Sequence, residues 1–280
     1  MPVRIQSVST GAFTMDYFQF GHGKETLVIL PGLSVHNVMV FADSVAEAYQ
    51  LFTDDYTIYV FDRRKELPPT YSVYEMAQDT AEALHVLGLD EVNLFGASQG
   101  GMIAMEVAID HPELVQKLVL GSTSACVEER QYQVIEKWIQ LAKSADAKGL
   151  CLAFGEAIYP QDVFEQSRTL LTEAAESLTD EDLKRFIVLA EGMTGFDVTN
   201  DLEKITCPVL VIGSKDDQVL GGDASERIIE HLTAHAELYM YDGYGHAVYD
   251  TAPDYKERIQ TFLKPAQNAP GCTRMHQNAP

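Results

Sequence analysis

Strand-like and helix-like segments alternate along most of this 280-residue chain. Short apolar runs, typical of buried strands, are followed by stretches in which apolar residues recur every three or four positions, as on one face of a helix. Because right-handed crossovers join such units, the alternation predicts an α/β fold with a mostly parallel, eight-stranded sheet covered by helices on both faces. The expected strands are residues 3–8, 14–20, 26–30, 57–61, 92–95, 117–120, 209–212 and 237–241, and the helices between the later ones are 38–50, 73–87, 101–110, 224–233 and 254–263.

Three segments depart from this alternation. The first two strands are joined by "STGAF" without a helix, which predicts an antiparallel hairpin at one edge of the sheet. Residues 122–200 contain only helical patterns, at 127–144, 162–177 and 180–191, and are interpreted as a helical cap inserted between two parts of the core, residues 1–121 and 201–264. Residues 265–280 are polar, rich in proline and contain "QNAP" twice, which predicts a disordered tail.

Composition narrows the classes of partner. Hydrophobic residues make up 46% of the chain, enough for a large buried core. The formal net charge of −22 repels phosphate backbones and anionic lipid headgroups, so neither nucleic acid nor a membrane surface is an expected partner. The first residues, "MPVRIQSVST", lack the apolar segment of a secretion signal, and a cytoplasmic location is expected.

The cysteines favour neither a zinc site nor a disulfide framework. Cys126, Cys151, Cys207 and Cys272 are widely spaced and form no C-x-x-C pair. No metal site is therefore predicted.

The stretch "VNLFGASQGGMIAMEVA", residues 92–108, places Ser98 between a buried strand and a helix. The flanking glycines could serve only to pack the helix tightly on the strand, with the serine as a small filler or helix cap. The G-x-S-x-G pattern in this setting is also that of a nucleophile elbow, a sharp turn that exposes the serine hydroxyl. That interpretation requires a base and an orienting acid elsewhere in the chain.

Both partners are found at the ends of later strands. His246 follows Gly245 in the loop after the last expected strand, at the same carboxyl edge of the sheet as Ser98. The strand at 209–212 ends in "GSKDD", which supplies two adjacent carboxylates at that edge. One acid there could hold the histidine in its correct tautomer. Strand geometry indicates that only one of the two points inward.

Along the chain the serine, the acid and the histidine occur in the order found in the α/β-hydrolase superfamily. From about residue 15 to 263 the chain resembles the small, cap-bearing serine hydrolases of that superfamily. The matching segments are "LVILPGL", "VFDRR", "GASQGG", "GSKDD" and "GYGHA". The resemblance implies a triad of Ser98, Asp216 and His246. The family pattern selects Asp216, three residues after Gly213, with Asp217 as the alternate.

The resemblance also implies an oxyanion hole formed by the backbone N–H groups of Leu33 and Gln99. Many relatives have His-Gly where this chain has Pro31-Gly32, and Pro31 has no N–H to donate, so the family pattern defines this loop less closely than the serine turn. The implied reaction is acyl transfer through an acyl-enzyme, without a cofactor.

The implied substrate is a small-molecule carboxylic ester. Ser98 argues against haloalkane dehalogenases and epoxide hydrolases, which use aspartate, and Ala247 stands where carbon–carbon bond hydrolases usually carry tryptophan. No acidic pocket suited to the amine of an aminopeptidase substrate is evident. An enol-lactonase, a thioesterase and a small-ligand receptor without turnover remain alternatives.

Three aromatic residues are candidate substrate contacts: His36, after the Pro31-Gly32 loop, and Trp138 and Phe196 in the insertion. Because the insertion precedes the acid-bearing strand, it is expected to cover the crevice and control access. The oligomeric state is left open.

Overall fold

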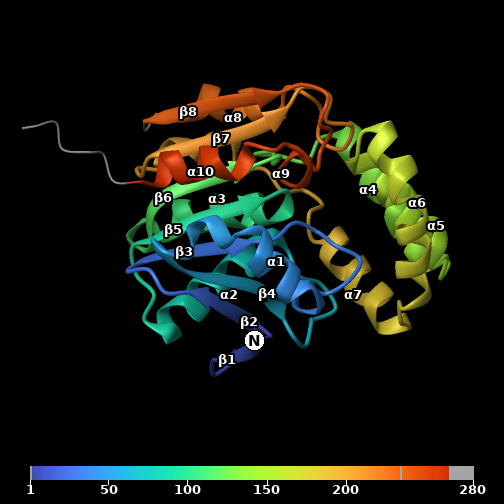
Figure 1. The fold of residues 1–280 in the computed structure, drawn as a ribbon, viewed down its shortest axis with the longest axis horizontal. Coiled ribbons are helices and arrows are strands. Elements are labelled where there is room, and N and C mark those ends of the chain that lie inside the picture. Colours follow the sequence, from blue (N-terminus) through green and yellow to red (C-terminus); the bar gives the residue numbers. More distant parts are fainter. Residues whose placement is uncertain (1, 234, 265–280) are drawn as a thin grey trace, which may run out of the picture.

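The computed structural model describes residues 2–233 and 235–264. In this part of the chain one eight-stranded sheet has the order β1-β2-β4-β3-β5-β6-β7-β8 (Figure 1). The strands are β1 (Ile5–Ser9), β2 (Thr14–Gly21), β3 (Glu25–Leu30), β4 (Tyr56–Arg64), β5 (Val92–Ala97), β6 (Val115–Gly121), β7 (Val209–Ser214) and β8 (Ala236–Tyr241). β1 pairs with β2, and β2 with β4, in antiparallel fashion, and all other pairs are parallel. The predicted sheet and its edge hairpin are confirmed.

Helices bury both faces of this sheet. Along β3, Val28 and Leu30 belong to one apolar core, whereas Leu27 and Ile29 belong to a second core on the opposite face. The first core is completed by α2 (Val73–Leu87), α3 (Gln99–Asp110) and α8 (Ala224–His231), and the second by α1 (Ala42–Ala48), α9 (Val248–Thr251) and α10 (Tyr255–Leu263). Four short 3₁₀ helices lie between these elements: η1 (Val38–Phe41), η2 (Gln50–Phe52), η3 (Pro112–Leu114) and η4 (Thr199–Lys204). Two-sided burial explains why the central strands are apolar at nearly every position.

The ends of α2 show how local sequence sets helix boundaries. Ser72 and Glu75 form a reciprocal capping box that satisfies free N–H groups of the first turn. Gly88 ends the helix with φ +67°, a left-handed conformation that glycine adopts without steric cost. These signals fix both ends of α2, which packs on one face of the sheet.

Residues 129–191 form four helices beyond the carboxyl ends of the parallel strands, and Figure 1 shows them as a separate layer. They are α4 (Glu129–Lys143), α5 (Ala147–Ile158), α6 (Gln161–Glu176) and α7 (Asp180–Glu191), and are called the cap helices below. The sequence pattern predicts α4, α6 and α7 but not α5. Its segment, "AKGLCLAFGEAI", has two glycines and few polar positions, so its helical periodicity is weak. Gly155 lets α5 approach α6 closely, because a Cβ there would lie 2.4 Å from a methyl carbon of Leu171 on α6.

The predicted tail, residues 265–280, lies outside the described residues. Within the described ones, every helix is too short or too polar to cross a bilayer. Cys126, Cys151 and Cys207 carry free thiols.

Candidate active site

Ser98 occupies a sharp turn between β5 and α3. Its backbone has φ +52° and ψ −121°, a conformation that non-glycine residues rarely adopt. The neighbouring glycines make the turn possible, because a Cβ on Gly96 would lie 2.3 Å from the carbonyl oxygen of Gly100, and a Cβ on Gly100 would lie 2.0 Å from that of Leu30. The turn thus has the geometry of a nucleophile elbow.

His246 lies in the loop between β8 and α9, with its side chain only 3% exposed. Its Nε2 is 3.0 Å from Ser98 Oγ, and its Nδ1 is 2.8 Å from Asp217 Oδ2. A carboxylate can only accept a hydrogen bond, so Nδ1 carries a proton and Nε2 is left free to accept the Ser98 hydroxyl proton. The structure therefore joins serine, histidine and an acid in one hydrogen-bonded chain.

The acid that contacts His246 is Asp217, and the prediction of Asp216 was wrong. The second oxygen of Asp217 accepts the backbone N–H groups of Val219 and Leu220, each at 2.8 Å, which turns the carboxylate inward. Its side chain is 4% exposed. Counting from the strand end placed the acid one residue too early, because the turn after Ser214 brings the second carboxylate, rather than the first, under the imidazole.

Asp216 instead ties together the two loops that carry the acid and the histidine. Its Oδ1 accepts the Ser214 hydroxyl at 2.6 Å and the Gly243 N–H at 3.0 Å, and its Oδ2 accepts the Gly245 N–H at 3.0 Å. Partial burial favours a higher pKa for this carboxyl, but these hydrogen bonds outweigh it and hold the pKa below its ordinary value. Asp216 is thus a structural neighbour of His246 rather than its partner.

The two predicted oxyanion donors come from two segments near Ser98. Gln99 is the first residue of α3 and is fully buried, and the first N–H groups of a helix have no acceptor within the helix. Leu33 follows β3 and is 8% exposed. Gly32 approaches the elbow so closely that a Cβ there would lie 3.0 Å from Ser98 Cβ. The loop that carries Leu33 is therefore packed directly against the serine turn.

A narrow apolar pocket opens onto Ser98 and His246. Of the three predicted substrate contacts, only Trp138 is among its lining residues, with its ring centroid 4.6 Å from that of Phe154. Tyr249, which sequence analysis overlooked, also lines it, and its place three residues after His246 was the only available signal. The full lining is Leu33, Ser98, Met102, Ile135, Trp138, Phe154, Ile158, Met193, Val219, Leu220, His246 and Tyr249.

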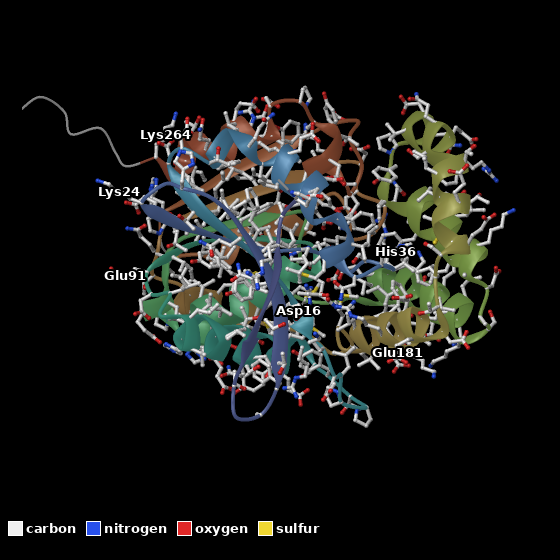
Figure 2. All side chains as sticks on the ribbon, turned by 60° about the horizontal axis from the view of Figure 1, so that its bottom comes forward. Asp16, Lys24, His36, Glu91, Glu181 and Lys264 are labelled. Atoms are coloured by element: carbon white, nitrogen blue, oxygen red, sulfur yellow. The ribbon has the colours of Figure 1, made fainter. Side chains whose placement is uncertain are left out.

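His36 and Phe196 lie elsewhere, and their prediction as pocket residues was wrong. His36 Nε2 is 3.1 Å from the hydroxyl of Ser177 after α6, and Figure 2 shows His36 where the core faces the cap helices. Phe196 is buried in the core and its carbonyl accepts the N–H of Val127 at 2.9 Å. Both residues connect the insertion to the core or stabilise it internally.

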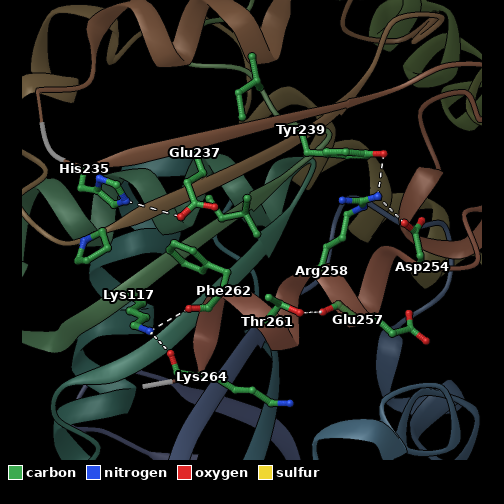
Figure 3. A pocket seen from close by; sticks show the side chains of 13 residues that line it. Lys117, His235, Glu237, Tyr239, Asp254, Glu257, Arg258, Thr261, Phe262 and Lys264 are labelled. Carbon is green, nitrogen blue, oxygen red and sulfur yellow. Dashed lines mark hydrogen bonds and ion pairs between the residues drawn. The ribbon is translucent and has the colours of Figure 1, made fainter. Parts of the chain in front are cut away.

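A larger hollow between β8 and α10 contains none of the residues around Ser98 (Figure 3). There Arg258 stacks on Tyr239, and Lys117 Nζ donates to the carbonyls of Phe262 and Lys264. These contacts fasten the end of α10 to the sheet. The hollow offers no nucleophile beside a base, so the pocket at Ser98 is the better candidate for chemistry.

One group of possible metal ligands occurs in the described residues: His85, His111 and Glu113, with ligand atoms within 4.8 Å of one another. These residues lie at the carboxyl ends of α2 and α3. Crossover helices run antiparallel to the strands, so this group is at the opposite edge of the sheet from Ser98. It contains no residue of the candidate site.

The chain is similar in sequence to known hydrolases. A family model described as serine aminopeptidase, S33, matches residues 21–251. A protein of Caulobacter vibrioides named as a carbamate hydrolase, RutD, is 26% identical over 254 residues, covering 87% of this chain and 92% of the relative.

Solved structures resemble the fold. The α/β-hydrolase MGS-M2, from a deep-sea metagenome library of the Medee basin, superposes with a TM-score of 0.83 at 21% identity, covering 94% of this chain and 98% of its own. The enol-lactonase from Burkholderia xenovorans LB400 superposes with a TM-score of 0.78 at 16% identity, covering 92% of this chain and 99% of its own.

Proposed function

We propose, from the premise that this chain belongs to the S33 serine aminopeptidase family of α/β-hydrolases, that it cleaves a carboxylic ester with an apolar acyl group. The observation that carries the proposal is the chain of hydrogen bonds from Ser98 through His246 to Asp217, at the mouth of an apolar pocket. In this proposal Ser98 is the nucleophile, His246 the general base and acid, and Asp217 the orienting acid.

The reaction follows from this geometry. Ser98 Oγ attacks the ester carbonyl while His246 Nε2 accepts its proton, and Asp217 stabilises the imidazolium that forms. His246 returns the proton to the leaving alcohol, which leaves an acyl-enzyme on Ser98. The same histidine then deprotonates water, which attacks the acyl carbonyl, and returns the proton to Ser98 Oγ as the acyl–oxygen bond breaks and the acid leaves. The proposed oxyanion donors, Leu33 and Gln99, stabilise the negative charge that develops on the carbonyl oxygen, and each such donor contributes about 3–4 kcal/mol in comparable sites.

The lining of the pocket indicates the substrate class. It contains no aspartate, glutamate, lysine or arginine, and its surface is formed mainly by aliphatic and aromatic groups. Such a pocket favours a hydrocarbon acyl chain over a small polar group such as a carbamate. It also offers no carboxylate to bind the amino group of a peptide substrate, so we do not extend aminopeptidase activity to this chain.

The proposal is tested with a fluorophosphonate probe and a panel of p-nitrophenyl esters from acetate to octanoate. We expect the probe to label Ser98 and at least the short and medium esters to be hydrolysed, because a serine activated by a histidine base reacts with both reagents. Lactones, acyl thioesters and carbamates are included in the same panel, so that their kcat/KM can be compared with that of the esters. Absence of both labelling and turnover would contradict the proposal. Labelling without turnover of any substrate would favour a ligand-binding role on the same fold.

Replacing Trp138 by alanine is expected to shift preference toward longer acyl chains. Trp138 is 3% exposed and packs against Phe154 in the pocket wall, so removal of its ring lengthens the space available to the acyl chain. The ratio of kcat/KM for octanoate to that for acetate should rise by about tenfold, the lower end of the effect of one methylene group in an apolar pocket. Phe196→Ala is the matched control, since Phe196 is a buried aromatic residue outside the pocket lining. An equal shift in both variants would contradict this assignment of the pocket wall.

A further inference from the structure

We propose that Arg63 is a positioning residue that holds the two halves of the oxyanion hole in register, and that Gln99 links this arrangement to cap helix α7. This inference rests on the proposed function, because it concerns the donors that stabilise the oxyanion. It assigns a role to a buried arginine that sequence analysis did not single out.

The contacts of one nitrogen atom carry the inference. Arg63 Nη2 donates to the carbonyl oxygen of Pro31 and to the side-chain Oε1 of Gln99, both at 2.8 Å. Pro31 begins the loop that leads to Leu33, and Gln99 itself carries the other proposed donor. A single guanidinium nitrogen therefore bridges the two chain segments whose N–H groups must converge on one oxygen atom.

Burial makes this bridge strong. The Arg63 side chain is 6% exposed and Gln99 is fully buried. Burial lowers the pKa of Arg63 to about 10, so the group still carries its charge at neutral pH. Charge-assisted hydrogen bonds in such surroundings are shorter and stronger than neutral ones at the surface. The bridge consequently resists the small movements that would separate Leu33 from Gln99.

The network is not optimised for stability alone. Among the described residues, Arg63 Nε and one oxygen of Asp62 are buried without a hydrogen-bond partner. Each such group costs free energy, and an apolar side chain of similar size would avoid that cost. A buried, incompletely paired arginine beside the nucleophile turn is the pattern expected where position matters more than stability.

Two contacts connect the same network to α7. Gln99 Nε2 donates to the carbonyl oxygen of Leu189 at 2.7 Å, in the last turn of α7, where carbonyl oxygens lack an N–H donor within the helix. Asp62 Oδ1 accepts the backbone N–H of Arg63 and also bonds Arg185 of α7. The cap therefore contacts the side chain of an oxyanion residue, in addition to forming the wall of the pocket.

The carboxyl end of α5 makes a corresponding contact on the histidine side. The N–H of Ala247, next to His246, donates to the carbonyl oxygen of Ile158 at 2.9 Å. A Cβ on Gly245 would lie 2.9 Å from that same oxygen, so the histidine loop fits closely under α5. Cap helices thus touch both sides of the site, which extends their role beyond the control of access expected from the sequence.

The physical consequence concerns the transition state. If Arg63 no longer holds Pro31 and Gln99, the N–H groups of Leu33 and Gln99 no longer point at the same oxygen atom. The oxyanion is then bound less tightly. The apolar pocket that binds the acyl chain in the ground state contains neither Arg63 nor Pro31. Loss of the bridge should therefore lower kcat and leave KM nearly unchanged.

The experiment compares Arg63→Met, Arg63→Lys and Gln99→Met with wild type on the preferred ester. Arg63→Met and Gln99→Met should lower kcat by about 100-fold, with KM within about threefold. The inhibition constant of a trifluoromethyl ketone with a matching acyl chain should rise by the factor by which kcat/KM falls, because the ketone forms a tetrahedral adduct that needs the same oxyanion donors. Arg63→Lys, which keeps a donor, should recover activity to within about tenfold of wild type.

Arg64→Met is the matched control. Arg64 is the neighbouring arginine, paired with Asp79 through two hydrogen bonds of 2.6 Å, but it touches neither Pro31 nor Gln99. Its loss should lower the melting temperature and leave kcat within about threefold of wild type.

Three outcomes would overturn the inference: a folded Arg63→Met variant with unchanged kcat, a change confined to KM, or an equal loss of kcat in Arg64→Met. If Arg63→Met does not fold, Gln99→Met decides, because it breaks the same bridge by replacing an uncharged side chain and keeps Arg63 bonded to Pro31. Wild-type enzyme that neither hydrolyses the esters nor reacts with fluorophosphonate contradicts the proposed function and this inference with it. Active wild type with active bridge variants contradicts the inference alone.

Discussion

Ser98→Ala is expected to lower kcat on a short p-nitrophenyl ester by about a million-fold, the scale seen when the nucleophile of a comparable triad is removed. The variant lacks the oxygen that forms the acyl-enzyme, while His246 and the apolar pocket remain. Its melting temperature should stay close to that of wild type, since no core contact is lost. Steady-state hydrolysis, corrected for spontaneous hydrolysis, and loss of fluorophosphonate labelling measure the effect.

Ser122→Ala provides the control. Ser122 is a buried serine just beyond β6, and like Ser98 it has a positive φ, +41° against +52°. Both substitutions therefore place alanine at a positive φ, but of the two serines only Ser98 contacts His246. Activity of Ser98→Ala close to that of Ser122→Ala would refute the nucleophile assignment.

Asp217→Asn is expected to lower kcat by about ten-thousand-fold. Asparagine retains the size of aspartate, but its amide can donate to His246 Nδ1. That donation favours the tautomer with the proton on Nε2, which cannot accept the Ser98 proton. A pH–rate profile on the same ester, together with the melting temperature, separates this effect from a loss of folding. Activity within tenfold of wild type would show that His246 is oriented by another group.

Asp216→Asn is the adjacent control and should reduce kcat by less than about tenfold, because Asp216 does not contact the imidazole. Its effect should instead be on stability. The folded-state pKa of Asp216 lies below its ordinary value, so the carboxylate stabilises the fold above about pH 4, and this contribution is lost as pH falls through the folded pKa. The wild type should therefore melt higher than Asp216→Asn at pH 7, and the difference should narrow in acid.

The class of fold could be predicted from the sequence because it depends on patterns that are local. Apolar runs marked the eight strands, and α2 carried its own start and stop signals in Ser72, Glu75 and Gly88. The same reasoning failed for α5, where two glycines and a nearly continuous apolar surface obscure the helical period. That helix packs closely against α6, with Gly155 facing Leu171, a contact that the local pattern does not reveal.

For the candidate site, the sequence by itself determined that Ser98 and His246 come to one edge of the sheet. Ser98 directly follows β5 and His246 lies in the loop after β8, and parallel strands end at a common edge. Only the tertiary structure decided that Asp217 and not Asp216 meets the histidine, that Trp138 but neither His36 nor Phe196 lines the pocket, and that Arg63 bridges Pro31 and Gln99. The physical reason is the scale of each effect. Strand ends are set by a periodicity that spans many residues, whereas the direction of one side chain depends on a few hydrogen bonds to segments far away in the chain, such as those that turn Asp217 inward.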